Sequence, residues 1–306
     1  MNLEDLAIGI VFLLQSTVGI LGNFSLLSYY LIHYYIQQTL RTKNLILTHL
    51  FTANSLIIVS KGVITTIQVF GVRWLISDFG CKLLLYIQRL GRNMSIGTTC
   101  LLTIFQAITI SPSDSCLKDL KVKAPKYIGL SIFLCWVLFM AINMIFPLYL
   151  SIKGNSKNLT RKRDLKYCST IGLNEFTGSL YIAFCVIPEV LLSVIIAWTG
   201  GFMVVILYRH KQRVQHIHST HVSISASPES RATQSILVLV FTFLGFYALS
   251  SILQGWNALV YNNGWLLMNI TAIISMCFPT IGPFIVNHNS FVYKFLFFCM
   301  RNQNIP

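Results

Sequence analysis

The chain has 306 residues, of which 55% are hydrophobic and only 10% are charged, and its mean hydropathy is +0.67. Soluble domains carry about 25% charged residues, so this composition excludes a soluble enzyme and indicates a protein that lies in a lipid bilayer. The net charge of +14 comes largely from short segments between apolar runs. Cations in such segments indicate contact with a membrane surface rather than with nucleic acid.

Apolar runs recur along the whole chain and predict an all-α bundle of transmembrane helices that forms a single domain over residues 1–306. Each run is long enough to cross a hydrocarbon core about 30 Å thick as a helix. Helices are the only spanning form for segments of this length, because lipid cannot satisfy exposed backbone groups. The seven predicted spans are 7–36, 45–70, 82–110, 127–150, 179–207, 234–255 and 265–287.

The distribution of basic residues predicts an N-terminus outside and a C-terminus in the cytoplasm, as in a multi-pass protein of the plasma membrane. In this orientation the inner segments hold more Lys and Arg than the outer ones, although the 151–178 loop narrows the difference. That loop contains the sequon Asn158-Leu159-Thr160, which we expect to carry glycan. Sequons that lie within predicted spans, where they should stay unmodified, begin at Asn23, Asn93 and Asn269.

Two cysteines fall at the predicted outer side, which is the oxidising side of the membrane. Cys81 lies at the outer end of the third span, and Cys168 lies in the second outer loop. No other pair is both outside the apolar runs and on that side, so we predict a disulfide between them, with two free thiols as the alternative. Cys299, in the tail after the last span, is a candidate for palmitoylation on weak evidence.

The third span carries a polar stripe that predicts a helix buried at the centre of the bundle. Its members are spaced three or four residues apart and therefore share one narrow helix face. They are Gln88, Arg92, Ser95, Thr99, Thr103 and Gln106. The second span has a similar face, made of Asn54, Lys61, Thr65 and Gln68.

Charged residues within the spans predict a ligand site in the outer half of the bundle. Lys61, Arg89, Arg92 and Glu189 all lie about 12–16 Å below the outer ends of their helices. A structural ion pair between Glu189 and one cation is the alternative use of these charges, and Lys61 is the expected partner. The excess of cations predicts a hydrated cavity or an anionic ligand, with Arg92 as the strongest candidate for contact and Arg89 and Gln88 beside it.

Several stretches of the sequence resemble the vomeronasal type-1 receptors, and the resemblance covers nearly the whole chain. The third inner loop and its flanks are the most specific part. The stretches are HLFTANSLIIVSKG, GRNMSIGTTCLLTIFQAITISP, NSKNLTRKRDLKYCS, CSTIGLNEF, ILYRHKQRVQHIHSTHVSISASPESRATQSILVLV and CFPTIGPF. Like that family, the chain lacks the Asp-Arg-Tyr and Asn-Pro-x-x-Tyr motifs of rhodopsin-like receptors, which leaves the activation switch undefined.

The resemblance implies a G-protein-coupled receptor that detects pheromones or related small molecules and couples to a Gi/o-type G protein. We expect the G protein to dock at the basic inner face around Gln106, Arg209, Lys211 and Arg213. The alternative is that these cations only reflect the positive-inside rule. A sulfated or carboxylated steroid-like molecule would suit the cations of the outer half.

Other classes of membrane protein fit the sequence less well. A transporter is disfavoured because no inverted repeat is detectable. A membrane-embedded hydrolase is disfavoured because the spans hold a single acidic residue and no hydrolase motif. A bitter-taste-like receptor is nearer in fold but lacks the CFPTIGPF stretch and this third inner loop. The histidine-rich segment RHKQRVQHIHSTH is interpreted as a solvated basic loop, so no metal or cofactor is expected.

Overall fold

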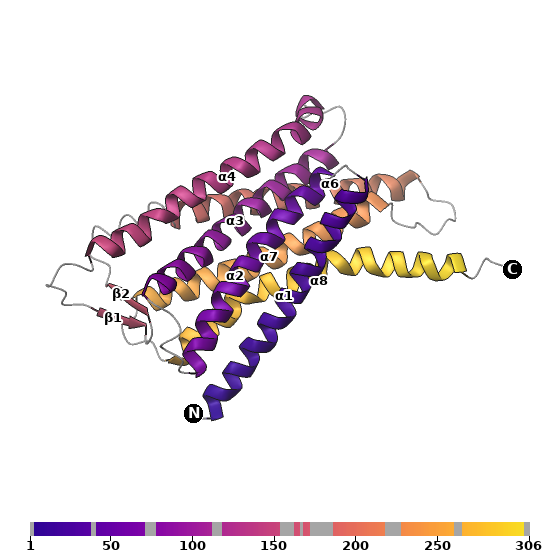
Figure 1. The fold of residues 1–306 in the computed structure, drawn as a ribbon. Helices are drawn as coiled ribbons and strands as arrows, with labels where there is room; N and C mark the ends of the chain where they lie inside the picture. Colours follow the sequence, from indigo (N-terminus) through magenta and orange to yellow (C-terminus); the bar gives the residue numbers. More distant parts are fainter. Residues whose placement is uncertain are drawn as a thin grey trace.

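The computed structural model describes residues 3–37, 41–70, 78–111, 118–153, 162–165, 168–171, 186–217, 228–259 and 265–302. These ranges contain long helices and one short hairpin (Figure 1). The helices are α1 (Leu3–Gln37), α2 (Thr42–Phe70), α3 (Asp78–Ile110), α4 (Lys118–Lys153), α6 (Ile187–Ile217), α7 (Pro228–Leu259) and α8 (Trp265–Asn302). The hairpin pairs β1 (Lys162–Leu165) with β2 (Cys168–Ile171) in antiparallel register.

The seven predicted spans are confirmed, since seven helices in the described ranges are long and apolar enough to cross a membrane. All seven helices extend beyond the predicted spans, and α4, α6, α7 and α8 extend furthest. Residues 179–185 of the fifth predicted span lie outside the described residues. α4 begins at Lys118 and α7 at Pro228, where a proline suits the first helical turn because no N–H is needed there. α8 continues to Asn302, and Figure 1 shows its C-terminal part turning away from the bundle.

The predicted central position of α3 is confirmed by burial and by its neighbours. In α3 and α2 the most apolar stretch is 67% and 61% buried, whereas in α6 it is only 17% buried. α3 contacts α2, α4, α6 and α7. A helix that touches four others cannot turn much of its surface to lipid, so its polar stripe faces protein.

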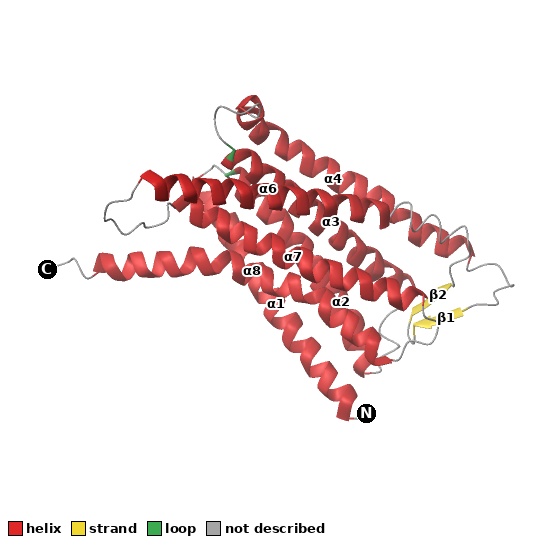
Figure 2. Ribbon diagram, turned by 180° about the vertical axis from the view of Figure 1, so that it is seen from behind, coloured by secondary structure: helices red, strands yellow, loops and turns green. Residues whose placement is uncertain are grey.

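The two ends of the bundle differ in what they carry. The N-terminus and the β1–β2 hairpin lie at one end, and the C-terminus lies at the other (Figures 1 and 2). This arrangement agrees with an N-terminus outside and a C-terminus inside the cell, and we call the two ends outer and inner accordingly. The hairpin was not predicted from the sequence. It lies over the outer end, where β2 contacts α3.

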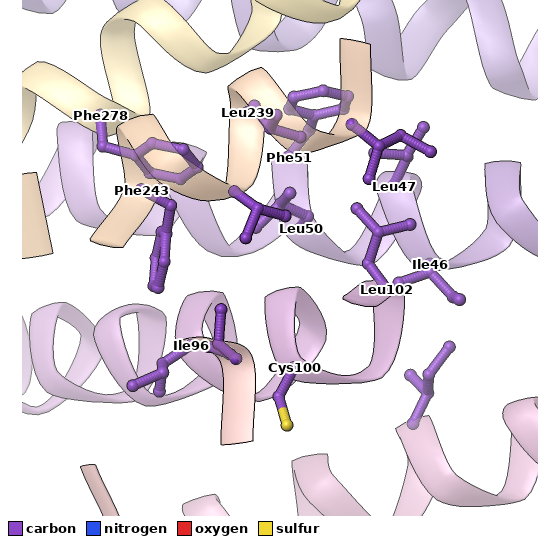
Figure 3. Packing of buried hydrophobic residues seen from close by; sticks show 14 of the residues in the cluster. Ile46, Leu47, Leu50, Phe51, Ile96, Cys100, Leu102, Leu239, Phe243 and Phe278 are labelled. Atoms are coloured by element: carbon purple, nitrogen blue, oxygen red, sulfur yellow. The ribbon is translucent and has the colours of Figure 1, made fainter. Parts of the chain in front are cut away.

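The inner half of the bundle is held by an apolar cluster, which we call the inner apolar core. It joins buried residues of α1, α2, α3, α4, α6, α7 and α8, and Figure 3 shows its central part. Its central members are Ile46, Leu47, Leu50, Phe51, Ile96, Cys100, Leu102, Leu239, Phe243 and Phe278. The rings of Phe243 and Phe278 meet edge to face with centroids 4.7 Å apart, the geometry that aromatic pairs prefer.

A bend-prone segment of α8 is tied to α1. Pro283 has no N–H, so the carbonyl of Pro279 lacks the helical hydrogen bond that a residue four positions later would donate. Asn23 supplies the missing donor: its Nδ2 donates to Pro279 O at 2.8 Å and to Gly19 O at 2.7 Å. A polar side chain buried in α1 therefore compensates for a proline in α8.

Candidate functional site

Arg92 of α3 joins three helices in the outer half of the bundle. Its Nε lies 3.4 Å from Oε1 of Glu189 on α6. Its Nη1 donates to Ser250 Oγ at 3.1 Å, and its Nη2 donates to Ser251 Oγ at 2.6 Å, both on α7. The guanidinium carbon lies 4.2 Å from the ring centroid of Tyr247, one turn before these serines.

This geometry gives Arg92 a partner on each guanidinium nitrogen and on one face. Arginine suits such a position because its donors form a planar fork and its flat face stacks on aromatic rings. The side chains of Arg92 and Glu189 are 17% and 22% exposed, so the pair is desolvated but not sealed. Arg92 therefore links α3 to α6 and α7 through charge and hydrogen bonds rather than through apolar packing.

The expected pairing of Lys61 with Glu189 is wrong. Glu189 pairs with Arg92 instead, and Lys61 donates a hydrogen bond to Ser275 Oγ on α8. Lys61 is only 9% exposed, and it lies near enough to Arg92 for the two positive charges to repel. The nearness of the two cations agrees with the shared depth expected for them, but depth along a helix does not reveal which neighbour a side chain faces.

The structure adds neutral residues that sequence reasoning missed. Ser250, Ser251 and Ser275 contact the two cations, and a single serine such as Ser275 looks like any other serine in an apolar helix. The adjacent serines in YALSSIL, at the depth of the charges, were the one available signal. We call the set Lys61, Arg92, Glu189, Tyr247, Ser250, Ser251 and Ser275 the outer polar cluster.

The other predicted ligand residues on α3 have less defined roles. Gln88 and Arg89 are half-buried on the turn above Arg92. Arg89 takes part in interactions of its own, so it is not an isolated charge. Below Arg92 the polar stripe is buried as predicted, and Ser95 Oγ donates to Asn54 Oδ1 at 3.1 Å, which connects α3 to the polar face of α2.

The outer end of α3 is anchored covalently, because Cys81 is disulfide-bonded. Its predicted partner Cys168 begins β2, which contacts α3, but the side chain of Cys168 lies outside the described residues. The pairing of Cys81 with Cys168 therefore stays a prediction. The sequon at Asn158 also lies outside the described residues.

The predicted G-protein-facing residues at the inner end differ in their exposure. Arg209 is exposed on α6, and the side chains of Lys211 and Arg213 are outside the described ones. Gln106 is 7% exposed, so in this conformation it faces the interior of the bundle and not its inner surface. Cys299 and the histidines of the third inner loop likewise have side chains outside the described set.

The chain is similar to known proteins over nearly its whole length. The profile of the vomeronasal organ pheromone receptor family matches residues 6–297. Vomeronasal type-1 receptor 4 of Homo sapiens is 47% identical over 292 residues, which are 95% of this chain and 97% of that receptor. Vomeronasal type-1 receptor 2 of Homo sapiens is 48% identical over 90% of this chain and 69% of its own length. Vomeronasal type-1 receptor 3 of Homo sapiens is 43% identical over 92% of this chain and 91% of its own length.

Proposed function

Because the chain belongs to the vomeronasal type-1 receptor family of chemosensory G-protein-coupled receptors, we propose that it detects pheromones or related small chemical cues and activates a Gi/o-type G protein. It is a multi-pass protein of the plasma membrane and not an enzyme. The family match over residues 6–297 sets aside the transporter and bitter-taste alternatives.

We assign the ligand to the outer half of the bundle, beside the outer polar cluster, Arg89 and Gln88. The observation that carries this assignment is the charge balance: Lys61 and Arg92 lie near each other, and Glu189 is the one anion that pairs with them among the described side chains. Charged groups in the hydrocarbon region are costly and mark functional sites in membrane proteins. A ligand with an apolar body and an acidic head, such as a sulfated or carboxylated steroid-like molecule, would offset the excess positive charge.

The disulfide and the glycan belong to the same outer end. A Cys81–Cys168 bond would hold the hairpin loop over the outer end of α3, near the route by which a ligand enters. Contact between β2 and α3 supports this pairing. Glycan at Asn158 would mark the same loop as extracellular.

The G protein would bind at the inner face, around Arg209, Lys211 and Arg213. The exposure of Arg209 supports this placement. Gln106 would join the docking surface only if the inner ends of α3 and α6 separate on activation, because it is buried in the present conformation.

A screen of acidic and neutral small molecules on receptor-expressing cells tests the proposal, with activation of individual G-protein classes as the readout. We expect at least one acidic activator and a response that is lost when Gi/o subunits are inactivated. The triple variant Arg209→Glu, Lys211→Glu, Arg213→Glu should abolish signalling at unchanged surface level. A matched reversal of the outer triplet Arg161, Lys162 and Arg163 should leave the G-protein step intact. Full signalling by the inner variant would leave only the topological role for those cations.

A further inference from the structure

The two central cations of the outer polar cluster are not equivalent. Arg92 has an anion, Glu189, and two serine hydroxyls as partners, and a ring lies against its face. In the described part of the chain, the hydrogen-bond partner of Lys61 is the neutral hydroxyl of Ser275. Among the described side chains, the charge of Arg92 is therefore compensated by a carboxylate, and that of Lys61 is not.

The binding free energy of an acidic ligand would differ between the two cations. To bind Arg92 through its Nε, a ligand carboxylate or sulfate must displace Glu189, and the displaced carboxylate is then left without its cation at membrane depth. At Lys61 the ligand displaces no anion. An ammonium has three donors and no fixed fork, so it can donate to an anionic oxygen while it keeps its hydrogen bond to the hydroxyl.

Burial strengthens the interaction of Lys61 with an anion. The residue is 9% exposed, and the positive charge of Arg92 acts on it. A desolvated ammonium beside a second cation is unfavourable without a counter-ion, and a charge-assisted hydrogen bond is strongest where water is excluded. One incoming anion would relieve both the desolvation and the repulsion.

We propose that Lys61, together with Ser275, is the group that binds the acidic head of the ligand, and that Arg92 and Glu189 act as a structural pair that positions α3, α6 and α7. This inference rests on the proposed outer ligand site and assigns a specificity-determining residue within it. Lys61 selects for acidic molecules, while the Arg92–Glu189 pair shapes the site for acidic and neutral molecules alike.

The competing role for Lys61 is structural, because its contact with Ser275 ties α2 to the proline-containing part of α8. The two roles predict opposite effects of removing the charge. If Lys61 is a ligand group held without an anion, Lys61→Met, which keeps most of the length of the side chain, removes an uncompensated charge. The midpoint of thermal unfolding then stays unchanged or rises. If Lys61 instead stabilises the contact between α2 and α8, the same variant lowers the midpoint of thermal unfolding.

The test uses matched probes that differ only in charge: a steroid 3-sulfate with its free alcohol, and a steroid carboxylic acid with its methyl ester. Dose–response curves for G-protein activation are measured on the wild type, Lys61→Met and Lys61→Arg at matched surface levels. We expect Lys61→Met to weaken the acidic member of an active pair by about tenfold to a hundredfold, as for loss of a charged hydrogen bond. The neutral member should be unaffected, and Lys61→Arg should retain most of the response to the acid.

The outcomes separate this inference from the proposed function. An unchanged response of Lys61→Met to an acidic activator of the wild type would overturn the role of Lys61 and leave the outer site standing. Equal weakening of acid and neutral probes, with a lower thermal midpoint in detergent, would overturn it in favour of the structural tie. A wild type that responds to neutral probes but to no acid would overturn the acidic ligand class and the role of Lys61 together.

Discussion

The outer and inner halves of the bundle hold the same helices together in different ways. In the outer half, α3 meets α6 and α7 through the guanidinium of Arg92 and its polar partners, beside a small apolar cluster around Leu90 and Met94. In the inner half, the same central helix meets α2, α6, α7 and α8 through the inner apolar core, which includes Ile196 of α6. The outer half leaves Lys61 able to bind a ligand anion without breaking the Arg92–Glu189 pair, whereas close-packed apolar side chains resist rearrangement. This difference in packing suits an outer end that binds a small molecule and an inner end that responds with a defined movement.

Removing Arg92 should have the largest effect on the outer half. Arg92→Met leaves Glu189 without a cation at membrane depth, and breaking a desolvated pair in this way costs about 3 kcal/mol. We expect a matching loss in the free energy of unfolding of the solubilised receptor, together with low surface expression. Arg92→Lys keeps the charge but not the planar fork, so it should recover only part of the loss. If Arg92→Met is as stable as the wild type, the outer half is not held by this residue.

Cavity formation in the inner apolar core should have the next largest effect. The side chain of Phe51 is fully buried, and its ring stacks on Tyr30 with centroids 6.4 Å apart. Transfer from water contributes little between helices in lipid, so the cost of Phe51→Ala is mainly lost packing, about 2 kcal/mol. Phe24 on α1 is the matched control, because it is 51% exposed on the lipid-facing surface. Equal losses of thermal stability in Phe51→Ala and Phe24→Ala would contradict the packing account.

The close approach of α2 and α3 links the two halves and can be tested with one methyl group. A Cβ at Gly91 would lie 2.9 Å from the backbone oxygen of Ala53 and 2.9 Å from Ile57 Cγ1. The backbone cannot yield cheaply, so Gly91→Ala should cost about 1–2 kcal/mol despite the better helix propensity of alanine. Gly129 on α4 has open space around it, so Gly129→Ala should be neutral or slightly stabilising. If the midpoints of thermal unfolding rise in both variants, α2 and α3 are packed less tightly at Gly91 than this distance indicates.

The smallest predicted effect concerns the polar contact between α1 and α8. Asn23→Ala removes the donor to Pro279 O and leaves that carbonyl unsatisfied, at a cost of about 1 kcal/mol. Adding Pro283→Ala restores a backbone N–H that can bond the same carbonyl, so the double variant should lose less stability than Asn23→Ala alone. Additive losses in the double variant would mean that Asn23 has another role.

The sequence predicted the helices and their depth better than it predicted their partners. Spans, the central α3 and the buried residues Ser95, Thr99 and Thr103 follow from hydropathy and helical periodicity, which are local properties. The rise per residue also placed Lys61, Arg92 and Glu189 at one level. It could not give the rotation of α6 and α2 about their axes, so the choice of partner for Glu189 was wrong. Ser250, Ser251 and Ser275 were missed because a neutral hydroxyl in an apolar helix usually bonds its own backbone.

Two double-mutant cycles that share Glu189→Gln test the central claim most directly. One combines it with Arg92→Met and the other with Lys61→Met, and the free energy of unfolding is measured for each single and double variant. Residues in direct contact show coupling energies of about 0.5–3 kcal/mol. We predict coupling near the upper part of that range for Arg92 with Glu189, and none beyond error for Lys61 with Glu189. Strong coupling of Lys61 with Glu189, and none of Arg92 with Glu189, would contradict both the structural pair and the role of Lys61 as the cation left for the ligand.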